Sequence, residues 1–245
     1  VVPGLARHHR VIAIDLPGFG ASSKPRGSYS APWLADHVFA LMDELGLERA
    51  AVAGNSMGGR VAMEMAMLKP ERVQAMACLC PAAAFTHRPA LGLVRVLRPE
   101  FGILAGRLPR ARIQKGLRDL FADASAIDDA WYEAAIDDFL TTWRSPRARM
   151  AFFCALRNIY LDEPDGDDGF WARLAHLKSP ALYIYGRRDV LITHRFGLKV
   201  QKVLPSAKVL VWDDCGHVPQ LEHSDRTVKE MLGFFATLSN TQKAG

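Results

Sequence analysis

The sequence predicts an α/β fold, with a mostly parallel, doubly wound sheet and an inserted helical cap. Short apolar runs typical of buried strands alternate with amphipathic runs at helical spacing near both ends of the chain. Between them, residues 84–178 show helical spacings broken by prolines and no strand pattern. The 245 residues, 49% of them hydrophobic, suffice for one sizeable core. We therefore expect an α/β core of residues 1–83 and 179–245, and a cap of residues 84–178.

The elements of the core follow from apolar runs and from the residues that interrupt them. Runs of four to eight apolar residues between polar or glycine-rich turns favour buried strands. Longer runs with apolar residues three and four positions apart favour helices, such as the one that Ser30 can cap and Gly46 can end. In chain order we predict a strand at 10–15, a helix at 30–45, a strand at 50–53, a helix at 57–68, a strand at 72–79, strands at 180–186 and 207–212 separated by a helix that closes at 204, and a last helix at 225–238.

A serine lies at the junction between the predicted strand at 50–53 and the helix that follows it. Residues 51–59 read Ala-Val-Ala-Gly-Asn-Ser-Met-Gly-Gly, so Ser56 has a glycine two positions away on either side. Gly-x-Ser-x-Gly between a strand and a helix is typical of a nucleophile elbow, where strand and helix approach too closely for a Cβ. The helix points its amino end at the site, so we expect the Met57 N–H to donate to an oxyanion. The alternative is a helix-capping serine with incidental glycines.

A nucleophilic serine needs a base, and the base needs a group that orients it. For this architecture the expected chain order is serine, acid, histidine. His217 lies in Cys-Gly-His-Val-Pro, between the last predicted strand and the last helix, and is our candidate base. Asp189 ends Gly-Arg-Arg-Asp after the preceding strand and is our candidate acid, because the segment after the strand at 72–79 offers no carboxylate. Asp213 and Asp214 share the loop of the histidine, and we expect them to fix its backbone or to face water.

Taken together, these motifs resemble the α/β-hydrolase family over nearly the whole chain. The matching segments are Asp-Leu-Pro-Gly-Phe-Gly-Ala-Ser at 15–22, Gly-Asn-Ser-Met-Gly-Gly at 54–59, Gly-Arg-Arg-Asp at 186–189 and Asp-Cys-Gly-His-Val-Pro-Gln-Leu-Glu at 214–222. The resemblance implies Ser56 as nucleophile, His217 as general base and acid, and Asp189 as its partner. It also implies a helical cap where residues 84–178 lie, and no metal or organic cofactor.

The amino-terminal end departs from the family pattern. Members have further strands before the loop at 15–22, and one of these ends in a His-Gly-type loop that supplies a second oxyanion donor. Residues 1–6 read Val-Val-Pro-Gly-Leu-Ala, which is similar to the helix after that loop, and the first residue is not methionine. We therefore expect an amino-terminally incomplete version of a longer enzyme. Losing one oxyanion donor costs about 10²–10³ in turnover.

The elbow serine limits the reactions that the resemblance allows. It excludes family members with an aspartate nucleophile, the haloalkane dehalogenases and epoxide hydrolases. We expect a serine hydrolase that cleaves carboxylic esters of hydrophobic acyl substrates through an acyl-enzyme. The alternative is a hydrolase of carbon–carbon bonds in ring-fission (meta-cleavage) products, which the elbow segment resembles, although Val218 follows the histidine where those enzymes usually have tryptophan. A cofactor-free haloperoxidase, a thioesterase and a non-catalytic ligand-binding protein of this fold also stay open.

The cap contributes candidates for an acyl-binding pocket, although most such residues simply pack inside a cap. These apolar residues are Leu91, Leu93, Leu97, Phe101, Ile103, Leu104, Phe121, Trp131, Phe139, Trp143, Phe152 and Phe153.

Composition limits the remaining classes of partner. The net charge is +5, but the one modest basic cluster, at 88–118, holds a single aromatic residue, so we expect no nucleic-acid binding. The longest uncharged stretch, 73–85, is too short for stable membrane insertion. Four cysteines without C-x-x-C spacing favour free thiols, no metal site and a cytoplasmic location. Gly18 and Gly20 do not make a nucleotide-binding motif, because Ser23 occupies the third glycine position. The expected partner is a small hydrophobic ester, and a homodimer stays open.

Overall fold

The computed structural model describes the chain except residues 97, 101–105, 107 and 242–245. Within the described residues one sheet has four parallel strands in the order β1-β2-β3-β4. The strands are β1 (Ala50–Asn55), β2 (Val73–Leu79), β3 (Ala181–Gly186) and β4 (Lys208–Trp212). Because all four run the same way, their carboxyl ends meet at one edge of the sheet, where open α/β sheets place their sites. The predicted parallel α/β sheet is confirmed.

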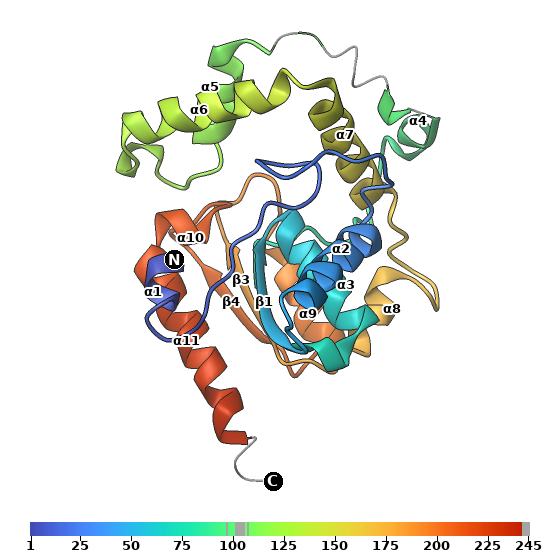
Figure 1. The fold of residues 1–245 in the computed structure, drawn as a ribbon, viewed down its shortest axis with the longest axis vertical. Helices are drawn as coiled ribbons and strands as arrows, with labels where there is room; N and C mark the ends of the chain where they lie inside the picture. The colour runs from blue at the N-terminus through green and yellow to red at the C-terminus, as the bar shows by residue number, and fades with distance from the viewer. Residues whose placement is uncertain (97, 101–105, 107, 242–245) are drawn as a thin grey trace.

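Helices cover both faces of this sheet and a group of helices lies beyond its end (Figure 1). One face carries α2 (Ala31–Glu44), α3 (Met57–Leu68), α8 (Phe170–Ala175) and α9 (Arg195–Val203). The other face carries α1 (Val2–Leu5) and α11 (Ser224–Thr241), and the short α10 (Pro219–Glu222) precedes α11. The cap helices are α4 (Leu91–Val96), α5 (Arg110–Arg118), α6 (Asp129–Trp143) and α7 (Pro146–Leu161), and 3-10 turns lie at Pro70–Arg72 and Ala124–Ala126.

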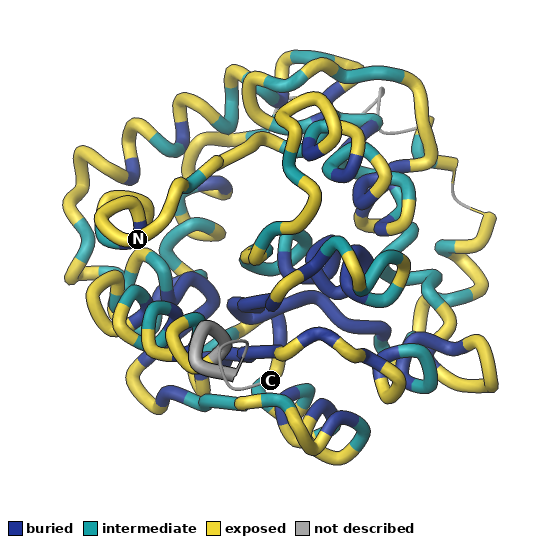
Figure 2. Tube along the Cα trace, turned by 60° about the horizontal axis from the view of Figure 1, so that its bottom comes forward, coloured by how far each residue is buried: buried dark blue, intermediate teal, exposed yellow. Residues whose placement is uncertain are grey.

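Alternation of side chains along the strands builds a core on each face of the sheet. On β3, Tyr183 and Tyr185 pack with α3 and α9 residues, whereas Leu182 and Ile184 pack on the opposite face with residues of α11 such as Met231. These strand residues are fully buried, so β3 reads as a continuous apolar run, as expected for a parallel strand covered on both sides. Figure 2 shows the buried residues gathered in the centre of the trace, with exposed residues around them.

Most predicted elements agree with the structure within two residues. The strands at 50–53, 72–79, 180–186 and 207–212 are present, as are the helices at 30–45 and 57–68. Ser30 caps its helix as expected, because its side chain accepts from the Trp33 N–H. The last helix begins one residue before the predicted position and extends to Thr241.

The predicted strand at 10–15 is wrong. These residues have no regular secondary structure, and Ile12 and Ile14 are each 41% exposed. An apolar run becomes a strand only where a neighbouring strand takes its backbone hydrogen bonds. In the described part of the chain, β1 pairs with β2 alone and forms no ladder with residues 10–15. The apolar pattern of residues 10–15 indicates burial, but no strand among the described residues pairs with them.

Helices and turns make up the described part of residues 84–178, which contains no strand. Four pocket candidates, Phe139, Trp143, Phe152 and Phe153, form an aromatic cluster around Trp143 within the cap, with ring centroids 5.6–5.8 Å apart, and all but Trp143 are half-buried. Leu93, by contrast, is 62% exposed. The candidates Leu97, Phe101, Ile103 and Leu104 lie outside the described residues. No described helix has the length and apolar character needed to cross a membrane.

Two glycines let β1 and α3 meet at a sharp turn. A Cβ at Gly54 would lie 2.2 Å from the Gly58 carbonyl carbon, and one at Gly59 would lie 2.7 Å from Pro81 Cβ. Such distances leave no room for a side chain, because the atoms met at Gly54 belong to backbone. The close approach of strand and helix therefore requires Gly54 and Gly59, whereas a Cβ at Gly58, the glycine after the serine in the motif, would meet nothing within 4 Å.

We expect Gly54→Ala to lower the free energy of unfolding by about 1–3 kcal/mol, because the methyl group would overpack the turn. The matched control is Gly58→Ala in the same motif, where a Cβ has no neighbour within 4 Å. That control should be neutral or stabilising by up to about 1 kcal/mol, since alanine favours a helix over glycine. Urea unfolding of both variants measures the difference, and equal stabilities would contradict the packing argument.

Candidate active site

Ser56 lies at the turn between β1 and α3 in a strained backbone conformation. Its φ of 52° and ψ of −115° are rare for a residue with a side chain. Neighbouring backbone holds the turn: the Ser56 N–H donates to Leu79 O (2.9 Å), and the Ser56 carbonyl accepts from the N–H groups of Arg60 (3.1 Å) and Ala82 (3.0 Å). The turn between strand and helix therefore has the form expected of a nucleophile elbow.

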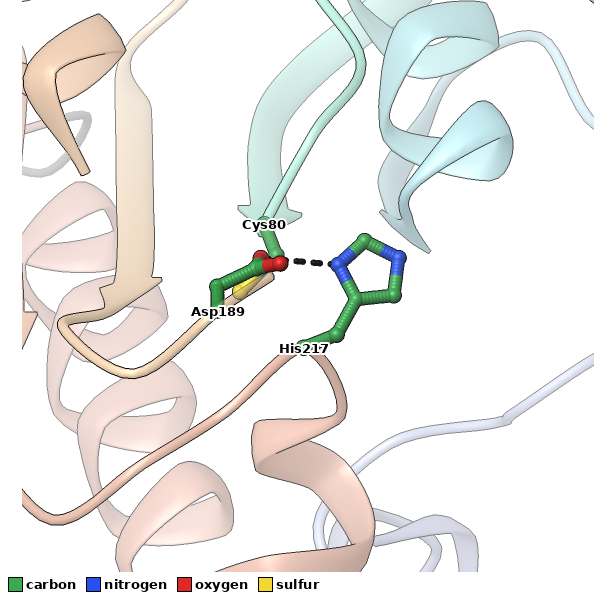
Figure 3. Close-up of side chains that lie close together, drawn as sticks. All are labelled: Cys80, Asp189 and His217. Carbon is green, nitrogen blue, oxygen red and sulfur yellow. Dashed lines mark hydrogen bonds and ion pairs between the residues drawn. The ribbon is translucent and has the colours of Figure 1, made fainter. Parts of the chain in front are cut away.

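Asp189 and His217 form a buried hydrogen-bonded pair, as Figure 3 shows. His217 Nδ1 lies 2.7 Å from Asp189 Oδ2, and the two side chains are 5% and 0% exposed. The other oxygen, Oδ1, accepts from the backbone N–H groups of Leu191 and Ile192, both at 2.8 Å. An ionised carboxylate only accepts hydrogen bonds, so it places the imidazole proton on Nδ1. The lone pair of Nε2 is then left to take a proton from another group.

The turns that carry this pair are packed backbone against backbone. A Cβ at Gly186 would lie 2.0 Å from the Gly216 carbonyl oxygen. The Arg188 N–H donates to Cys215 O (3.0 Å), and the Arg187 N–H donates to Trp212 O (2.8 Å). Gly-Arg-Arg-Asp thus lies directly against the loop that carries the histidine, which explains its glycine.

Asn55 connects the serine turn to the histidine loop. Its side-chain Nδ2 donates to His217 O (2.9 Å) and to Leu79 O (3.0 Å). The elbow residue next to Ser56 therefore bonds directly to the main chain of His217. In the described residues no hydrogen bond joins the Ser56 hydroxyl to the His217 ring, and such bonds often form only when a substrate binds. The sequence analysis quoted Asn55 in the elbow motif but gave it no role.

Met57 is the first residue of α3, so its N–H has no acceptor within the helix. Among the described residues this N–H donates to no other group. Its position directly after Ser56 fits the predicted oxyanion donor, since helix amino ends favour negative charge. The Met57 assignment remains a prediction.

Cys80 is a neighbour of the pair, and the sequence analysis predicted only a free thiol there. It follows β2, has a φ of 41° and is fully buried. Its Sγ lies 3.5 Å from Gly216 O, and thiol, carboxylate and imidazole atoms all lie within 4.8 Å of one another. Burial, and then the Asp189 charge, raise the pKa of the Cys80 thiol. Cys80 contacts Asp189 because β2 and β3 are neighbouring strands, and no sequence motif predicts this contact.

A Cys/Asp/His set is chemically able to bind zinc, so the cluster needs a test for fit. Zinc binds thiolate, and the raised pKa of the Cys80 thiol opposes its deprotonation. The Asp189 and His217 ligand atoms already satisfy each other at 2.7 Å. The geometry therefore fits a hydrogen-bonded pair beside a neutral thiol rather than a metal centre. All four cysteines of the chain are free.

Asp213 and Asp214 have partners other than His217. Asp213 pairs with Arg187, whose hydrogen bond and charge lower the pKa of this exposed carboxyl. Asp214 lies 3.2 Å from Arg226 and 3.6 Å from the ring of His223. Of the carboxylates considered from the sequence, Asp189 alone is bonded to the candidate base in the described structure.

The cap also touches the histidine loop. The His217 N–H donates to Leu120 O (2.7 Å) in the segment after α5. Phe121, Tyr132 and Val218 form a separate buried apolar cluster at the same place. Val218, which follows the histidine, thus packs against the cap, and Phe121 is a pocket candidate that lies next to the site.

Comparison with known proteins identifies the fold family and several relatives. The family model described as alpha/beta hydrolase fold matches residues 1–224. The 2-hydroxymuconate semialdehyde hydrolase of a Pseudomonas strain (CF600) is 29% identical over 96% of this chain and 80% of its own. A 2-hydroxy-6-oxononadienedioate/2-hydroxy-6-oxononatrienedioate hydrolase of Cupriavidus pinatubonensis is 30% identical over 95% of this chain and 79% of its own. The acetyltransferase component of an acetoin cleaving system of Pseudomonas putida is 32% identical over 95% of this chain, which spans only 58% of that relative.

Solved structures agree with the family assignment. A meta-cleavage product hydrolase aligns over 96% of this chain and 83% of its own, with a TM-score of 0.76 and 24% identity, which supports the fold. A bacterial membrane phospholipase A aligns over 92% of this chain and 69% of its own, with a TM-score of 0.70 and 28% identity.

We expect Asp189→Asn to slow fluorophosphonate labelling of Ser56 by about 10⁴, because the amide would favour the wrong imidazole tautomer, as in other triads. The control is Asp213→Asn, which removes a carboxylate of the neighbouring loop that pairs with Arg187. It should label at the wild-type rate. Intact-mass spectrometry over time measures both rates, and equal slowing by the two substitutions would contradict the assignment of Asp189.

Proposed function

Because the chain belongs to the alpha/beta hydrolase fold family, we propose that it is a serine hydrolase. In this proposal Ser56 is the nucleophile, His217 the general base and acid, and Asp189 the group that orients it. The observation that carries it is the buried 2.7 Å hydrogen bond from His217 Nδ1 to Asp189, which leaves Nε2 free. The elbow conformation of Ser56, and the bond from Asn55 to the His217 carbonyl, support the same roles.

For the reaction we propose hydrolysis of a carbon–carbon bond in a ring-fission product, a 2-hydroxy-6-oxo-dienoate. Support comes from relatives named as hydrolases of 2-hydroxymuconate semialdehyde and of 2-hydroxy-6-oxononadienedioate, which are 29% and 30% identical over 95% or more of this chain. The elbow segment Gly-Asn-Ser-Met-Gly-Gly supports the same class. This choice replaces the ester substrate expected from the sequence as the leading proposal.

The chemistry requires the same groups as ester cleavage, with a different leaving group. Ser56 Oγ attacks the 6-oxo carbon while His217 Nε2 takes the hydroxyl proton, and Met57 N–H donates to the oxyanion. This step requires the 2-oxo-3-ene tautomer of the substrate, in which the proton of the 2-hydroxyl has moved to carbon 5. The bond between carbons 5 and 6 then breaks, and its electron pair is delocalised through the alkene onto the 2-oxo oxygen. His217 returns the proton to this fragment, which leaves as a 2-hydroxy-dienoate. Water, activated by His217, then hydrolyses the acyl-serine to a carboxylic acid.

Ester hydrolysis is the second candidate. Two observations favour it: the 28% identity to a phospholipase A, and Val218 at the position where ring-fission hydrolases usually have tryptophan. The acyl-enzyme half of the reaction is identical, because both reactions pass through the same serine ester. Only the group that leaves first distinguishes them.

A parallel assay separates these candidates. Purified protein is supplied with a 2-hydroxy-6-oxo-dienoate, followed by loss of its visible absorbance, and with p-nitrophenyl esters of two to twelve carbons. A kcat/KM for the dienoate at least 10²-fold above the best ester supports carbon–carbon hydrolysis, and the reverse ratio supports an esterase. Ligand binding without turnover of either substrate, and without labelling by a fluorophosphonate, would identify a non-catalytic member of the fold.

We expect Ser56→Ala to lower kcat on the preferred substrate by about 10⁶, because no other group in the proposed mechanism can form the acyl-enzyme. Ser206→Ala, at an exposed serine between α9 and β4, is the control and should keep wild-type activity. Steady-state kinetics together with circular dichroism separate loss of chemistry from loss of fold. Activity of Ser56→Ala within tenfold of wild type would falsify the nucleophile assignment.

A further inference from the structure

Glu222 makes contacts that the proposed mechanism does not use. It is the last residue of α10 and closes the segment that begins at Asp214. One carboxylate oxygen, Oε1, accepts from the Gly216 N–H (2.8 Å) and lies 3.6 Å from Cys215 Sγ. The other oxygen, Oε2, accepts from the Ala122 N–H of the cap (2.7 Å). A single side chain therefore bonds the residue before the candidate base to the cap.

The same two segments also touch without Glu222. The His217 N–H donates to Leu120 O at 2.7 Å, and a Cβ at Gly216 would lie 2.4 Å from the same oxygen. We call the contact between residues 120–122 and 215–218 the cap–histidine seam. Gly216 therefore has no room for a side chain, and the two segments are in direct backbone contact.

The main chain of His217 is held from two sides. Its N–H bonds to the cap segment and its carbonyl accepts from Asn55, the neighbour of Ser56. The main chain of the candidate base is thus hydrogen-bonded to the cap on one side and to the nucleophile turn on the other, while Asp189 bonds its ring. The Glu222 carboxylate gives the cap side charge-assisted hydrogen bonds, which are stronger than neutral ones.

We propose that Glu222 is a positioning residue for His217, which holds the base in line with Asp189 and Ser56 by bonding Gly216 to Ala122 of the cap. The proposal rests on the proposed function of His217 as base. In this arrangement the position of residues 120–122 affects the alignment of His217 with Asp189 and Ser56. The cap therefore acts on the chemical step as well as on substrate binding.

The test compares three substitutions in the otherwise unchanged protein. Glu222→Ala removes both acceptors, whereas Glu222→Gln keeps one carbonyl oxygen and loses the charge. Glu230→Gln is the matched control, because Glu230 is a carboxylate on the following helix, α11, that bonds Lys208 (2.7 Å) away from the seam. Wild-type turnover and fluorophosphonate labelling are measured first, so that failure of the proposed function is seen independently.

We expect Glu222→Ala to lower kcat by 10- to 100-fold with KM changed less than threefold, because small misplacements of a catalytic group reduce rate steeply. Glu222→Gln should lie between this variant and wild type, and Glu230→Gln should equal wild type. Deuterium exchange should quicken in both 117–123 and 213–218 in Glu222→Ala. The resonance of the His217 Nδ1–H proton should shift or broaden.

Two results would overturn the proposal. One is a kcat within twofold of wild type in Glu222→Ala. The other is a loss in which kcat and KM change together, the His217 resonance is unmoved and the glutamine variant is no better than alanine, which indicates a purely structural role. If the wild-type protein neither turns over substrate nor is labelled, the proposed function fails. Unchanged deuterium exchange at 117–123 and 213–218 in Glu222→Ala would then also exclude a role of Glu222 in holding the cap–histidine seam.

Discussion

The close backbone contact between the turn after β3 and the loop after β4 is the constraint on which the site depends. Gly186 can approach the Gly216 carbonyl because it carries no side chain, and this contact brings the Asp189 turn against the His217 loop. The Asp189 carboxylate is fixed in one orientation, because two backbone N–H groups donate to one oxygen and the histidine ring bonds the other. A buried carboxylate without such partners would be strongly disfavoured. The geometry of the proposed acid and base is therefore a consequence of main-chain packing.

The cap is bonded to the core at two places, and each contact reaches an element that carries a proposed site residue. In the middle of the cap, after α5, residues 120–122 bond the histidine loop. At the end of α7, Asp162 pairs with the buried Arg60 of α3, one turn after Ser56. Arg60 also lies 3.1 Å from the buried Glu64, and Arg173 of α8 lies 2.6 Å from the same carboxylate.

Burial opposes charge within this ion cluster. It lowers the pKa of the Arg60 guanidinium and raises that of the Asp162 carboxyl, while the opposite charges act in the other direction. Removal of one partner would leave an uncompensated buried charge, so the members are mutually dependent. The cluster joins α3, the helix that follows Ser56, to the end of α7 and to α8.

Local sequence signals located the groups whose roles depend on local geometry. The Gly-x-Ser-x-Gly motif predicted the tight turn at Ser56. Asp189 and His217 follow strands whose order along the chain the apolar runs predicted. The sequence did not predict contacts between residues that are far apart in the chain. Glu222 and Ala122 are 100 positions apart, and the contact of Cys80 with Asp189 depends on which strands are neighbours.

Two further differences have the same origin. Asp162 begins an acidic stretch whose composition favours exposure to solvent, but its side chain is only 23% exposed because it pairs with the buried Arg60. Residues 10–15 carry the apolar pattern of a strand, yet strand formation requires a partner that the pattern does not specify. Composition and spacing indicate which local structure a segment can adopt. Which strand or charged group it pairs with is decided by the rest of the chain.

The choice between carbon–carbon and ester substrates lies outside the three proposed catalytic residues. In both proposed reactions Nε2 of His217 takes the serine proton and returns it to the leaving fragment, a dienolate in one case and an alkoxide in the other. A carbon leaving group is acceptable only when its electron pair is delocalised, and the dienoate provides that delocalisation only after the proton of its 2-hydroxyl has moved to carbon 5. What the protein must add is a site that favours this transfer of a proton to carbon. Next to the candidate base, Val218 packs against Phe121 and Tyr132 of the cap.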